Sequence, residues 1–336
     1  MNQCYLGVDV GSVSTNLVIL DDRRELVEKL YLRTRGDPIG ALKASLRTLG
    51  PRLADLAVRG LGATGSGRQL AGVMLGADIV KNEITAHAVA AQRLVPDVRT
   101  VIEIGGQDSK IIILREGVVV DFAMNTVCAA GTGSFLDQQA ARLGVPIEEF
   151  GDLAGRSTAP VRIAGRCSVF AESDMIHKQQ VGHALPDIIA GLCQALVRNY
   201  LNNVGKGKDI RPPIVFQGGV AANAGIREAF REALGCEIQV PEHFEVMGAI
   251  GAGLLAAESA PAYARSKFRG IGLAEEEVRT TGRECRGCAN QCEVVTLEVA
   301  GQAAASWGDR CGKWSGALRA EPSAPDRELE TAVPAI

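Results

Sequence analysis

The chain has 336 residues, 46% of them hydrophobic and 22% charged, which is enough for two domains with ordinary cores and excludes a disordered or fibrous chain. The net charge of −3 gives no electrostatic reason to expect binding to nucleic acid. Nine cysteines accompany an N-terminus without a basic and apolar leader, which favours metal or redox chemistry over structural disulfides. No apolar run approaches the roughly 18 residues that span a bilayer, so we expect a cytoplasmic protein with no membrane partner.

One local pattern occurs twice in the first half of the chain: a short apolar strand, a turn of small residues with an acid, and a second apolar strand. The first copy places strands at Tyr5–Val10 and Leu17–Leu20. The second copy places them at Thr100–Ile104 and Ile111–Leu114, with a further strand expected at Val118–Phe122. A duplicated domain with a phosphate-binding hairpin on each side of a cleft has this pattern.

Helical spacing alternates with these strands and predicts an α/β fold. We expect helices at Ala41–Leu49, Glu83–Leu94, Cys128–Leu143, Ser168–Gln180, Ala184–Asn202 and Met247–Ala257, and a strand at Pro213–Gln217. Glu83 and His87 lie on one face of their helix, either near the cleft or as a helix-surface pair with a satisfied histidine.

The turns of both copies have the composition of phosphate-binding loops. Glycine lets backbone N–H groups approach an anion, hydroxyl groups add donors, and an acid at a strand end can hold Mg²⁺ through water. One such turn alone is equally an ordinary hairpin turn, but a third glycine-rich segment follows at Phe216–Ile226. Together the three segments predict a nucleotide cleft.

The three glycine-rich segments resemble the two phosphate motifs and the adenosine motif of the actin, heat-shock-chaperone and sugar-kinase superfamily. Within it, the chain is most similar to the ATPase activators (activases) of 2-hydroxyacyl-CoA dehydratases and the related ATPase subunits of benzoyl-CoA reductases. The resemblance covers roughly Tyr5 to Ala257. Its branch-specific stretches are Ala63–Gly65 with Gly67 and Arg68, Glu83–Ala88, Ile104–Lys110, and the segments around Cys128 and Cys167. Asn16 and Glu103 depart from the pattern, since many members have Lys and Asp at these positions.

The resemblance implies an actin-like (ribonuclease H-like) fold of duplicated domains around a nucleotide cleft that binds ATP and Mg²⁺. The expected parts are subdomain I at 1–98, completed by 245–260; subdomain II at 99–244; a linker at 261–282; a cysteine metal module at 283–316; and a disordered tail at 317–336. Asp9, Glu103 and Asp108 are the expected catalytic residues, and Asp9 is expected to hold Mg²⁺ through water. The expected nucleotide ligands are Gly11, Ser12, Ser14, Thr15, Gly105, Gly106, Gln107, Lys110, Gly218, Gly219, Asn223 and Gly248.

Cys128 and Cys167 each stand at the expected start of a helix, where the dipole favours a thiolate. Two separated cysteines are by default buried structural thiols. The matching segments of the activators imply instead that they bind a [4Fe-4S] cluster, with the other two thiolates supplied by the second subunit of a homodimer. Cys4, Cys193 and Cys236 lie in strand or helix patterns and are expected in the core.

Cys285, Cys288, Cys292 and Cys311 form a separate group near the C-terminus, and such crowding indicates metal binding. Three tightly spaced thiols and a remote fourth are typical of many [4Fe-4S] sites, while zinc also takes four thiolates and half of a zinc-ribbon pattern is present. A second cluster, zinc, and no metal all remain open. Trp307 and Trp314 flank Cys311 and are expected to cover the site.

The function that follows is ATP-dependent transfer of low-potential electrons. The resemblance implies that ferredoxin or flavodoxin supplies the electron and that an iron–sulfur dehydratase or reductase, which acts on a CoA thioester, accepts it. The alternative is a small-molecule kinase of the sugar-kinase type, which needs a catalytic base and a substrate pocket but has no use for paired thiols. A purely regulatory nucleotide-binding protein is a third interpretation, and ATP turnover distinguishes it from the first.

Overall fold

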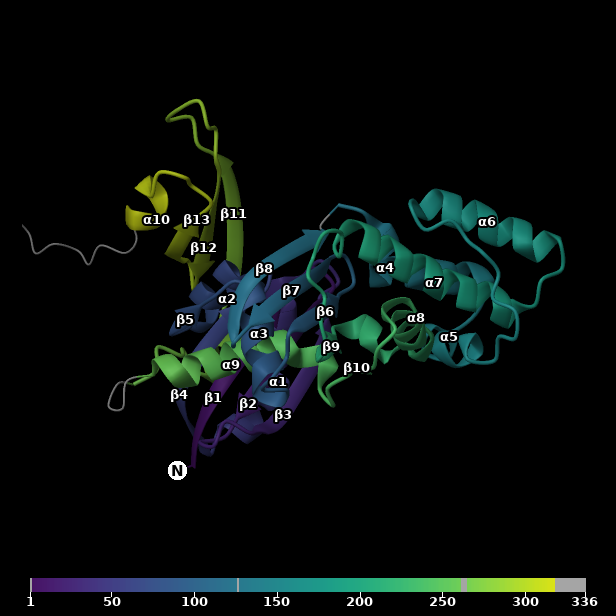
Figure 1. Cartoon of the computed structure of the whole chain (residues 1–336). Coiled ribbons are helices and arrows are strands. Elements are labelled where there is room, and N and C mark those ends of the chain that lie inside the picture. The colour runs from purple at the N-terminus through teal and green to yellow at the C-terminus, as the bar shows by residue number, and fades with distance from the viewer. Residues whose placement is uncertain (1, 126, 261–264, 318–336) are drawn as a thin grey trace, which may run out of the picture. The chain divides into compact units, whose positions relative to one another are not determined.

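The computed structural model describes residues 2–125, 127–260 and 265–317, which divide into two units, Met1–Ala274 and Glu275–Ile336 (Figure 1). The boundary falls inside the expected linker at 261–282. Residues 265–274 belong to the first unit, where Ser266 and Lys267 hydrogen-bond to Asp78 and the 3₁₀ helix η4 (Ile271–Ala274) lies against α1 (Pro38–Leu53). The expected tail at 317–336 lies outside the described residues except for its first residue.

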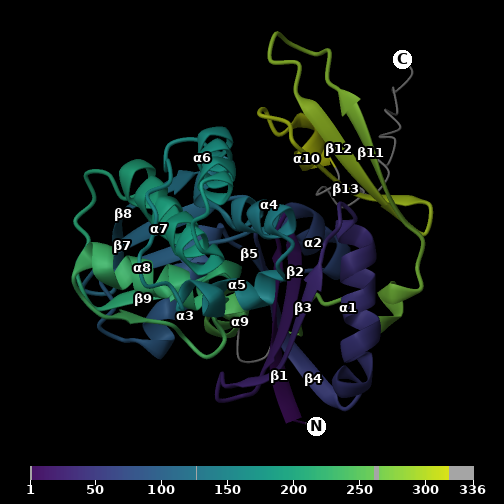
Figure 2. The ribbon, with the colours of Figure 1, turned by 90° about the vertical axis from the view of Figure 1, so that its right-hand side faces the viewer.

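The first sheet of unit 1 has five strands in the order β3-β2-β1-β4-β5. They are β1 (Asn2–Val10), β2 (Ser14–Leu20), β3 (Leu26–Arg33), β4 (Leu56–Thr64) and β5 (Ile79–Val80). β1, β2 and β3 form an antiparallel meander, and β4 and β5 continue the sheet parallel to β1. α1 lies against β2, β3 and β4 (Figure 2), and α2 (Arg68–Leu75) connects β4 to β5. The side chain of Asp37 caps α1 by accepting the Gly40 N–H.

The second sheet of unit 1 has the same topology. Its strands are β6 (Thr100–Ile104), β7 (Ser109–Arg115), β8 (Val118–Asn125), β9 (Ile214–Gln217) and β10 (Ile238–Gln239), in the order β8-β7-β6-β9-β10. β6, β7 and β8 are an antiparallel meander, and β9 and β10 run parallel to β6. The predicted duplication is therefore present in the strand order of both sheets.

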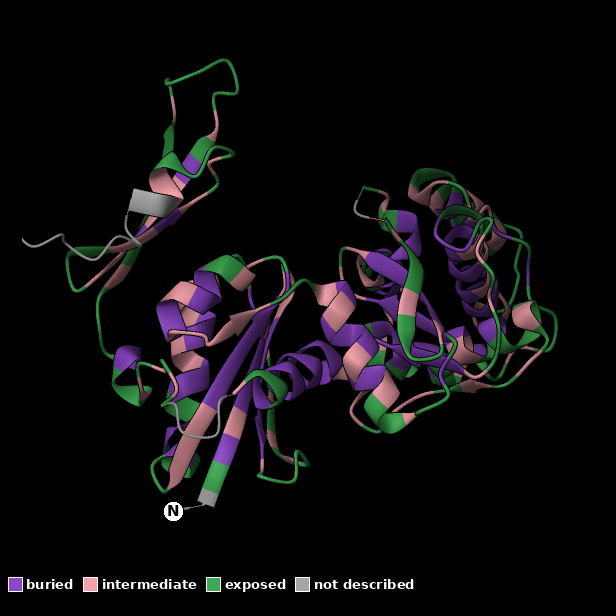
Figure 3. Ribbon diagram, turned by 60° about the vertical axis from the view of Figure 1, so that its left-hand side comes forward, coloured by how far each residue is buried: buried purple, intermediate pink, exposed green. Residues whose placement is uncertain are grey.

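Two helices join the halves. α9 (Met247–Ser259) is buried at every residue from Met247 to Ala257 (Figure 3) and lies against β1, β4 and α3 (Glu83–Leu94). The approach is close because the sheet carries glycine beneath the helix: a Cβ at Gly7 or Gly62 would lie 1.9 or 2.0 Å from a carbonyl oxygen of α9. Side chains of α3 and α9 share one hydrophobic cluster with both sheets, which fixes the two turns on a common cleft.

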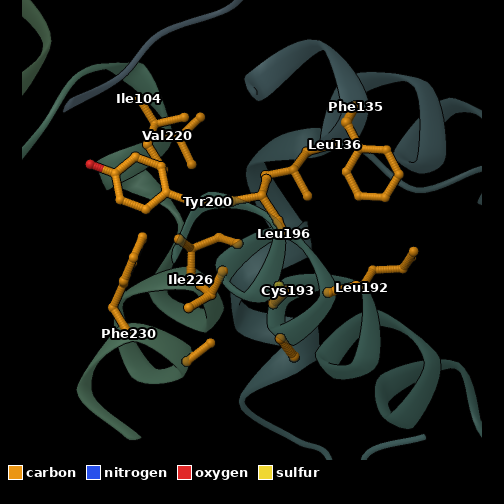
Figure 4. Close-up of a cluster of buried hydrophobic side chains, with 14 of the residues drawn as sticks. Ile104, Phe135, Leu136, Leu192, Cys193, Leu196, Tyr200, Val220, Ile226 and Phe230 are labelled. Atoms are coloured by element: carbon orange, nitrogen blue, oxygen red, sulfur yellow. The ribbon is translucent and has the colours of Figure 1, made fainter. Parts of the chain in front are cut away.

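The remaining helices of the second half are α4 (Gly133–Leu143), α5 (Ile147–Ala154), α6 (Ser168–Gln180), α7 (Leu185–Asn203) and α8 (Ala224–Leu234). Their apolar side chains form the largest core cluster with β6, β7 and β9, centred on Tyr200, Phe230 and Leu196 (Figure 4). α6 differs, since only Ala171 and Met175 are buried in it. Among the described residues, no helix combines the length and apolar character needed to cross a bilayer.

Unit 2 is a three-stranded antiparallel sheet in the order β11-β12-β13, followed by the short helix α10 (Lys313–Ala317). The strands are β11 (Val278–Glu284), β12 (Glu293–Val299) and β13 (Gln302–Trp307). Val294, Leu297 and Ser306 are its buried side chains within residues 275–315.

Candidate functional site

A cavity of about 550 Å³ is lined by the turns that follow β1, β6 and β9. Every expected nucleotide ligand and catalytic residue except Thr15 lines it. Thr15 instead points to the opposite face of β2, where its hydroxyl lies 3.0 Å from that of Thr34. Because side chains alternate along a strand, Ser14 and Asn16 face the cavity and Thr15 cannot.

Asp9, at the end of β1, occupies space that neighbouring glycines leave open. A Cβ at Gly248 would lie 2.1 Å from its Oδ2, and one at Gly65 would lie 2.4 Å from its Oδ1. Burial, followed by repulsion from Glu83, raises the pKa of Asp9 to about 7. A cation bound beside this carboxylate would favour its charged form.

Lys110 lies at the centre of an acidic cluster behind the second turn. Its ammonium Nζ is 2.9 Å from Glu103, 3.0 Å from Asp108 and 3.2 Å from Glu83, and its side chain is 2% exposed. Burial opposes the charge on Lys110, but the three carboxylates outweigh it and hold its pKa above the ordinary value. The Lys110 ammonium is thus paired with three carboxylates of the protein. Asp9 is a further acid that lines the same cavity.

Glu83 and His87 of α3 both line the cavity, which their helical spacing alone left undecided. His87 is buried, and its Nδ1 lies 2.7 Å from Nε2 of Gln217 at the end of β9. Burial and the nearby Lys110 charge lower the pKa of His87 to about 4, so its ring is neutral at pH 7 and accepts the Gln217 amide hydrogen. The ion pair of Glu83 and the hydrogen bond of His87 connect α3 to the second sheet. Gln217 lies in the third glycine-rich segment but was not among the expected site residues.

Two amide side chains in the cavity have unsatisfied polar atoms. Asn16 is 4% exposed, its Nδ2 lies 3.5 Å from the Glu245 carbonyl oxygen, and its Oδ1 has no partner. Asn223 caps α8 with Oδ1, while its Nδ2 has no partner. Buried polar atoms without partners are rare, so a donor to Asn16 and an acceptor from Asn223 are the groups that a ligand would supply here.

The residues fit a magnesium nucleotide. Carboxylate oxygens are the hard ligands that Mg²⁺ prefers. Among the described residues no three His, Cys, Asp or Glu side chains converge as a ready metal site. Mg²⁺ usually keeps several waters and takes one or two carboxylates together with phosphate oxygens, so Asp9 and Asp108 suffice as the protein ligands.

Cys128 and Cys167 are partly exposed and lie in two loops of the second half of unit 1. We call residues 127–131 the first cysteine loop and residues 164–167 the second. Cys167 directly precedes α6, as expected. Cys128 precedes only a single 3₁₀ turn, Ala129–Gly131, because Thr132 is extended and α4 begins at Gly133; the predicted continuous helix from Cys128 is wrong.

The start of α4, which follows the first cysteine loop, is hydrogen-bonded to the turn between β6 and β7. The Gly133 and Ser134 N–H groups donate to the carbonyl oxygens of Gly105 at 2.9 Å and Gly106 at 2.8 Å. The Ser134 hydroxyl also donates to Gly106 O at 2.6 Å. The turn is therefore directly connected to the residues that follow the first cysteine loop.

The second cysteine loop is connected to the same turn through α7. The Tyr200 hydroxyl donates to the carbonyl oxygen of Lys110 at 2.7 Å. Its neighbour Asn199, which is buried, donates to the carbonyl oxygens of Gly165 at 2.6 Å and Arg166 at 3.4 Å. Asn199 also borders the first loop, since a Cβ at Gly131 would lie 2.7 Å from its Oδ1. Neither Asn199 nor Tyr200 was indicated by the sequence.

The other cysteines separate into two groups. Cys4 and Cys193 are buried, and burial raises their pKa values to about 11 and about 12, as inert core thiols require. Cys236 is partly buried against the main core cluster. Cys285, Cys288, Cys292 and Cys311 lie in loops of unit 2 as free thiols.

Comparison with known proteins agrees with this geometry. The profile of the BadF/BadG/BcrA/BcrD ATPase family matches residues 6–256. The (R)-2-hydroxyglutaryl-CoA dehydratase activating ATPase of Acidaminococcus fermentans is 38% identical over 262 residues, which cover 76% of this chain and 97% of the relative.

Two solved structures are also similar. The crystal structure of A. fermentans (R)-2-hydroxyglutaryl-CoA dehydratase component A has a TM-score of 0.70 at 37% identity and covers 76% of this chain and 98% of its own. The activator of 2-hydroxyisocaproyl-CoA dehydratase from Clostridium difficile, solved with bound ADPNP, has a TM-score of 0.68 at 32% identity and covers 76% and 95%. The chain therefore has the fold of these activators and belongs to the BadF/BadG/BcrA/BcrD ATPase family.

Proposed function

We propose that this chain is an ATP-dependent activator that works as a homodimer and delivers low-potential electrons to an iron–sulfur dehydratase or reductase acting on a CoA thioester. The electron donor would be ferredoxin or flavodoxin. Three relatives that are 33–38% identical, each matched over at least 95% of its own length, are named as activators of CoA-ester dehydratases, which supports the assignment.

The cavity supports ATP as the ligand. Its glycine-rich turns offer backbone N–H groups to phosphates, and Asp9 with Asp108 offers carboxylates to Mg²⁺. Asn16 stands where many members carry Lys, so this chain offers an unpaired amide oxygen rather than a positive charge at this position. His87, whose pKa is lowered by burial and by the Lys110 charge, accepts the Gln217 amide hydrogen at Nδ1 and presents its other ring nitrogen as a donor rather than as a base.

Cys128 and Cys167 support a shared iron–sulfur site. Two thiols are half the set that a [4Fe-4S] cluster takes, and a two-fold dimer presents each of them twice. When bound, the cluster would supply a one-electron redox couple. The chain offers an apolar surface for the second subunit beside both loops, because Val127 is 95%, Val169 66% and Phe170 64% exposed.

The observation that carries the proposal is that both cysteine loops are connected to the turn and strand that hold Asp108 and Lys110, the first loop through the start of α4 and the second through α7. Ser134 contacts Gly106 on one side, and Tyr200 contacts Lys110 on the other. A change of phosphate contacts at this turn would shift both loops together. Hydrolysis of ATP can therefore act on the thiols without direct contact between nucleotide and cysteine.

The test is to remove these two links while leaving the cavity intact. Ser134→Ala and Tyr200→Phe should keep ATP hydrolysis but lose the nucleotide dependence with which a chelator bleaches the anaerobically reconstituted cluster. Loss of the Tyr200 hydroxyl removes one buried hydrogen bond, which costs about 0.5–1.5 kcal/mol of unfolding free energy. Tyr5→Phe, in a partly buried position of another cluster, is the matched control. Equal bleaching of the wild type with ADP and ATP would contradict the proposal.

A further inference from the structure

The hydrophobic core of unit 2 is too small to stabilise its fold by itself. Val294 and Leu297 are its two buried hydrophobic side chains within residues 275–315, and apart from Ser306 the rest of the sheet is intermediate or exposed. Units of about this size usually require a disulfide, a metal ion or oligomerisation to fold. Its four cysteines are free thiols, so no disulfide supplies the missing cross-link.

The topology brings all four thiols to one end of the sheet. β11 and β12 are antiparallel, so their connection, which contains Cys285, Cys288 and Cys292, lies at the end where β11 finishes. β13 is antiparallel to β12 and runs back to that end, and Cys311 lies in the loop that follows it. Trp314 confirms the arrangement, because its Nε1 donates to the Cys285 sulfur at 3.3 Å.

Backbone hydrogen bonds hold together the hairpin loop that carries three of the cysteines. The Cys285 N–H donates to the Cys292 carbonyl oxygen at 2.7 Å, which closes the loop. The Gln291 N–H donates to the Cys288 carbonyl oxygen at 3.3 Å and forms a turn inside it. The sulfur of Cys285 accepts both the Gly287 N–H and the indole N–H of Trp314, and hydrogen bonds to the sulfur are a usual second shell of metal thiolates.

We propose that Cys285, Cys288, Cys292 and Cys311 bind one metal centre of the four-thiolate class, either Zn²⁺ or a [4Fe-4S] cluster, which holds unit 2 together. In the described chain these thiols share one end of the sheet but do not yet converge as a group of three. Metal binding usually completes such a site, since ligands in small metal domains are drawn together by the ion. Trp314, with the Arg283 guanidinium 3.9 Å above its ring, covers one side of the centre.

The experiment measures metal in the full chain with the other site removed. Cys128→Ser/Cys167→Ser protein is purified anaerobically, and zinc, iron and sulfide are counted per chain. About one zinc, or about four irons with matching sulfide and visible absorption, identifies the metal. Adding Cys285→Ser/Cys288→Ser should abolish it, whereas adding Cys236→Ser, the control, should not.

Wild-type protein gives a second readout. With metal bound, residues 275–317 should resist limited proteolysis, and a chelator should expose them to cleavage while the ATPase activity of unit 1 persists. Less than a tenth of a metal per chain, metal content that is unaffected by Cys285→Ser/Cys288→Ser, or a mass showing disulfides among these cysteines after anaerobic purification would each overturn the proposal.

Discussion

Replacement of Asp9 by Asn should stabilise the nucleotide-free protein while it abolishes Mg·ATP hydrolysis. The pKa of Asp9 is raised from 3.8 to about 7, so the folded chain resists ionising a carboxylate that the unfolded chain ionises readily. Below pH 4 the Asp9 carboxyl is protonated in both the folded and the unfolded state, so it costs no stability. As the pH rises from 4 to 7 the unfolded state loses its proton first, so stability falls across this window and stays low above it.

The shift of about 3 pH units corresponds to roughly 4 kcal/mol as an upper limit at pH 8. Asp9 is partly open to the cavity, where water screens its charge, so about 2–4 kcal/mol is a realistic range. The Asp9→Asn variant has no charge to bury at this position, so its free energy of unfolding should be higher than that of the wild type by this amount. For a chain of this size the gain corresponds to a rise of about 5–10 °C in Tm.

The assay is denaturant or thermal unfolding of wild type and Asp9→Asn without nucleotide at pH 5 and pH 8. The advantage of the variant should be largest at pH 8 and shrink by about half at pH 5. Asp22→Asn, in the exposed turn after β2, is the control and should show no such pH dependence. Adding Mg·ATP should stabilise wild type more than Asp9→Asn. A variant that is less stable than wild type at pH 8 would refute the electrostatic reasoning.

Three further changes test other parts of the site. Lys110→Met should cost about 3–5 kcal/mol in urea unfolding, less at low pH, because it leaves buried carboxylates without their cation; an unaltered midpoint would show that the cluster is not charged. Gly248→Ala should keep the fold by circular dichroism but lose ATP hydrolysis, since its methyl group would displace the Asp9 carboxylate; normal turnover would contradict this role. Asn199→Ala should loosen the second cysteine loop, so that a chelator removes iron faster than from the exposed-site control Asn202→Ala, and equal rates would argue against it.

The sequence predicted those helices and strands that are determined by residues close to them in the chain. The strand at Thr100–Ile104 and the helices at Glu83–Leu94 and Ser168–Gln180 agree with the structure at both ends. Asn82 caps the helix that begins at Glu83, and short apolar runs beside glycine turns identify the phosphate loops. Such signals lie within a few residues of the element they define.

β4 was not predicted, because its glycines are required for packing against α9, which is distant in the sequence. Gly60 and Gly62 weaken its strand pattern, yet they lie beneath α9, where a Cβ at Gly62 would be 2.0 Å from the Ala252 carbonyl oxygen. The pairing of His87 with Gln217 likewise joins residues 130 positions apart. Their contact depends on how α3 crosses the second sheet, and no local pattern records it.

The strands of unit 2 escaped prediction for a different reason. β11 is almost entirely exposed and carries Arg and Thr where a half-buried strand would alternate with apolar residues. The four cysteines of this unit were recognised as a group in the sequence, because their close spacing alone indicates metal binding. The connection of the two cysteine loops through Asn199 and Tyr200 was not predicted, because in the sequence both residues fit the pattern of a long amphipathic helix.

The central claim is that two chains share one cluster through Cys128 and Cys167. The most direct measurement is iron and sulfide per chain, with EPR of the reduced state and sizing, after anaerobic reconstitution of a Cys285→Ser/Cys288→Ser background. We predict a dimer with about two irons per chain, and loss of the signal when Cys128 or Cys167 is also changed to Ser. A monomer with about four irons, or an unchanged EPR signal in the Cys128→Ser protein, would contradict it.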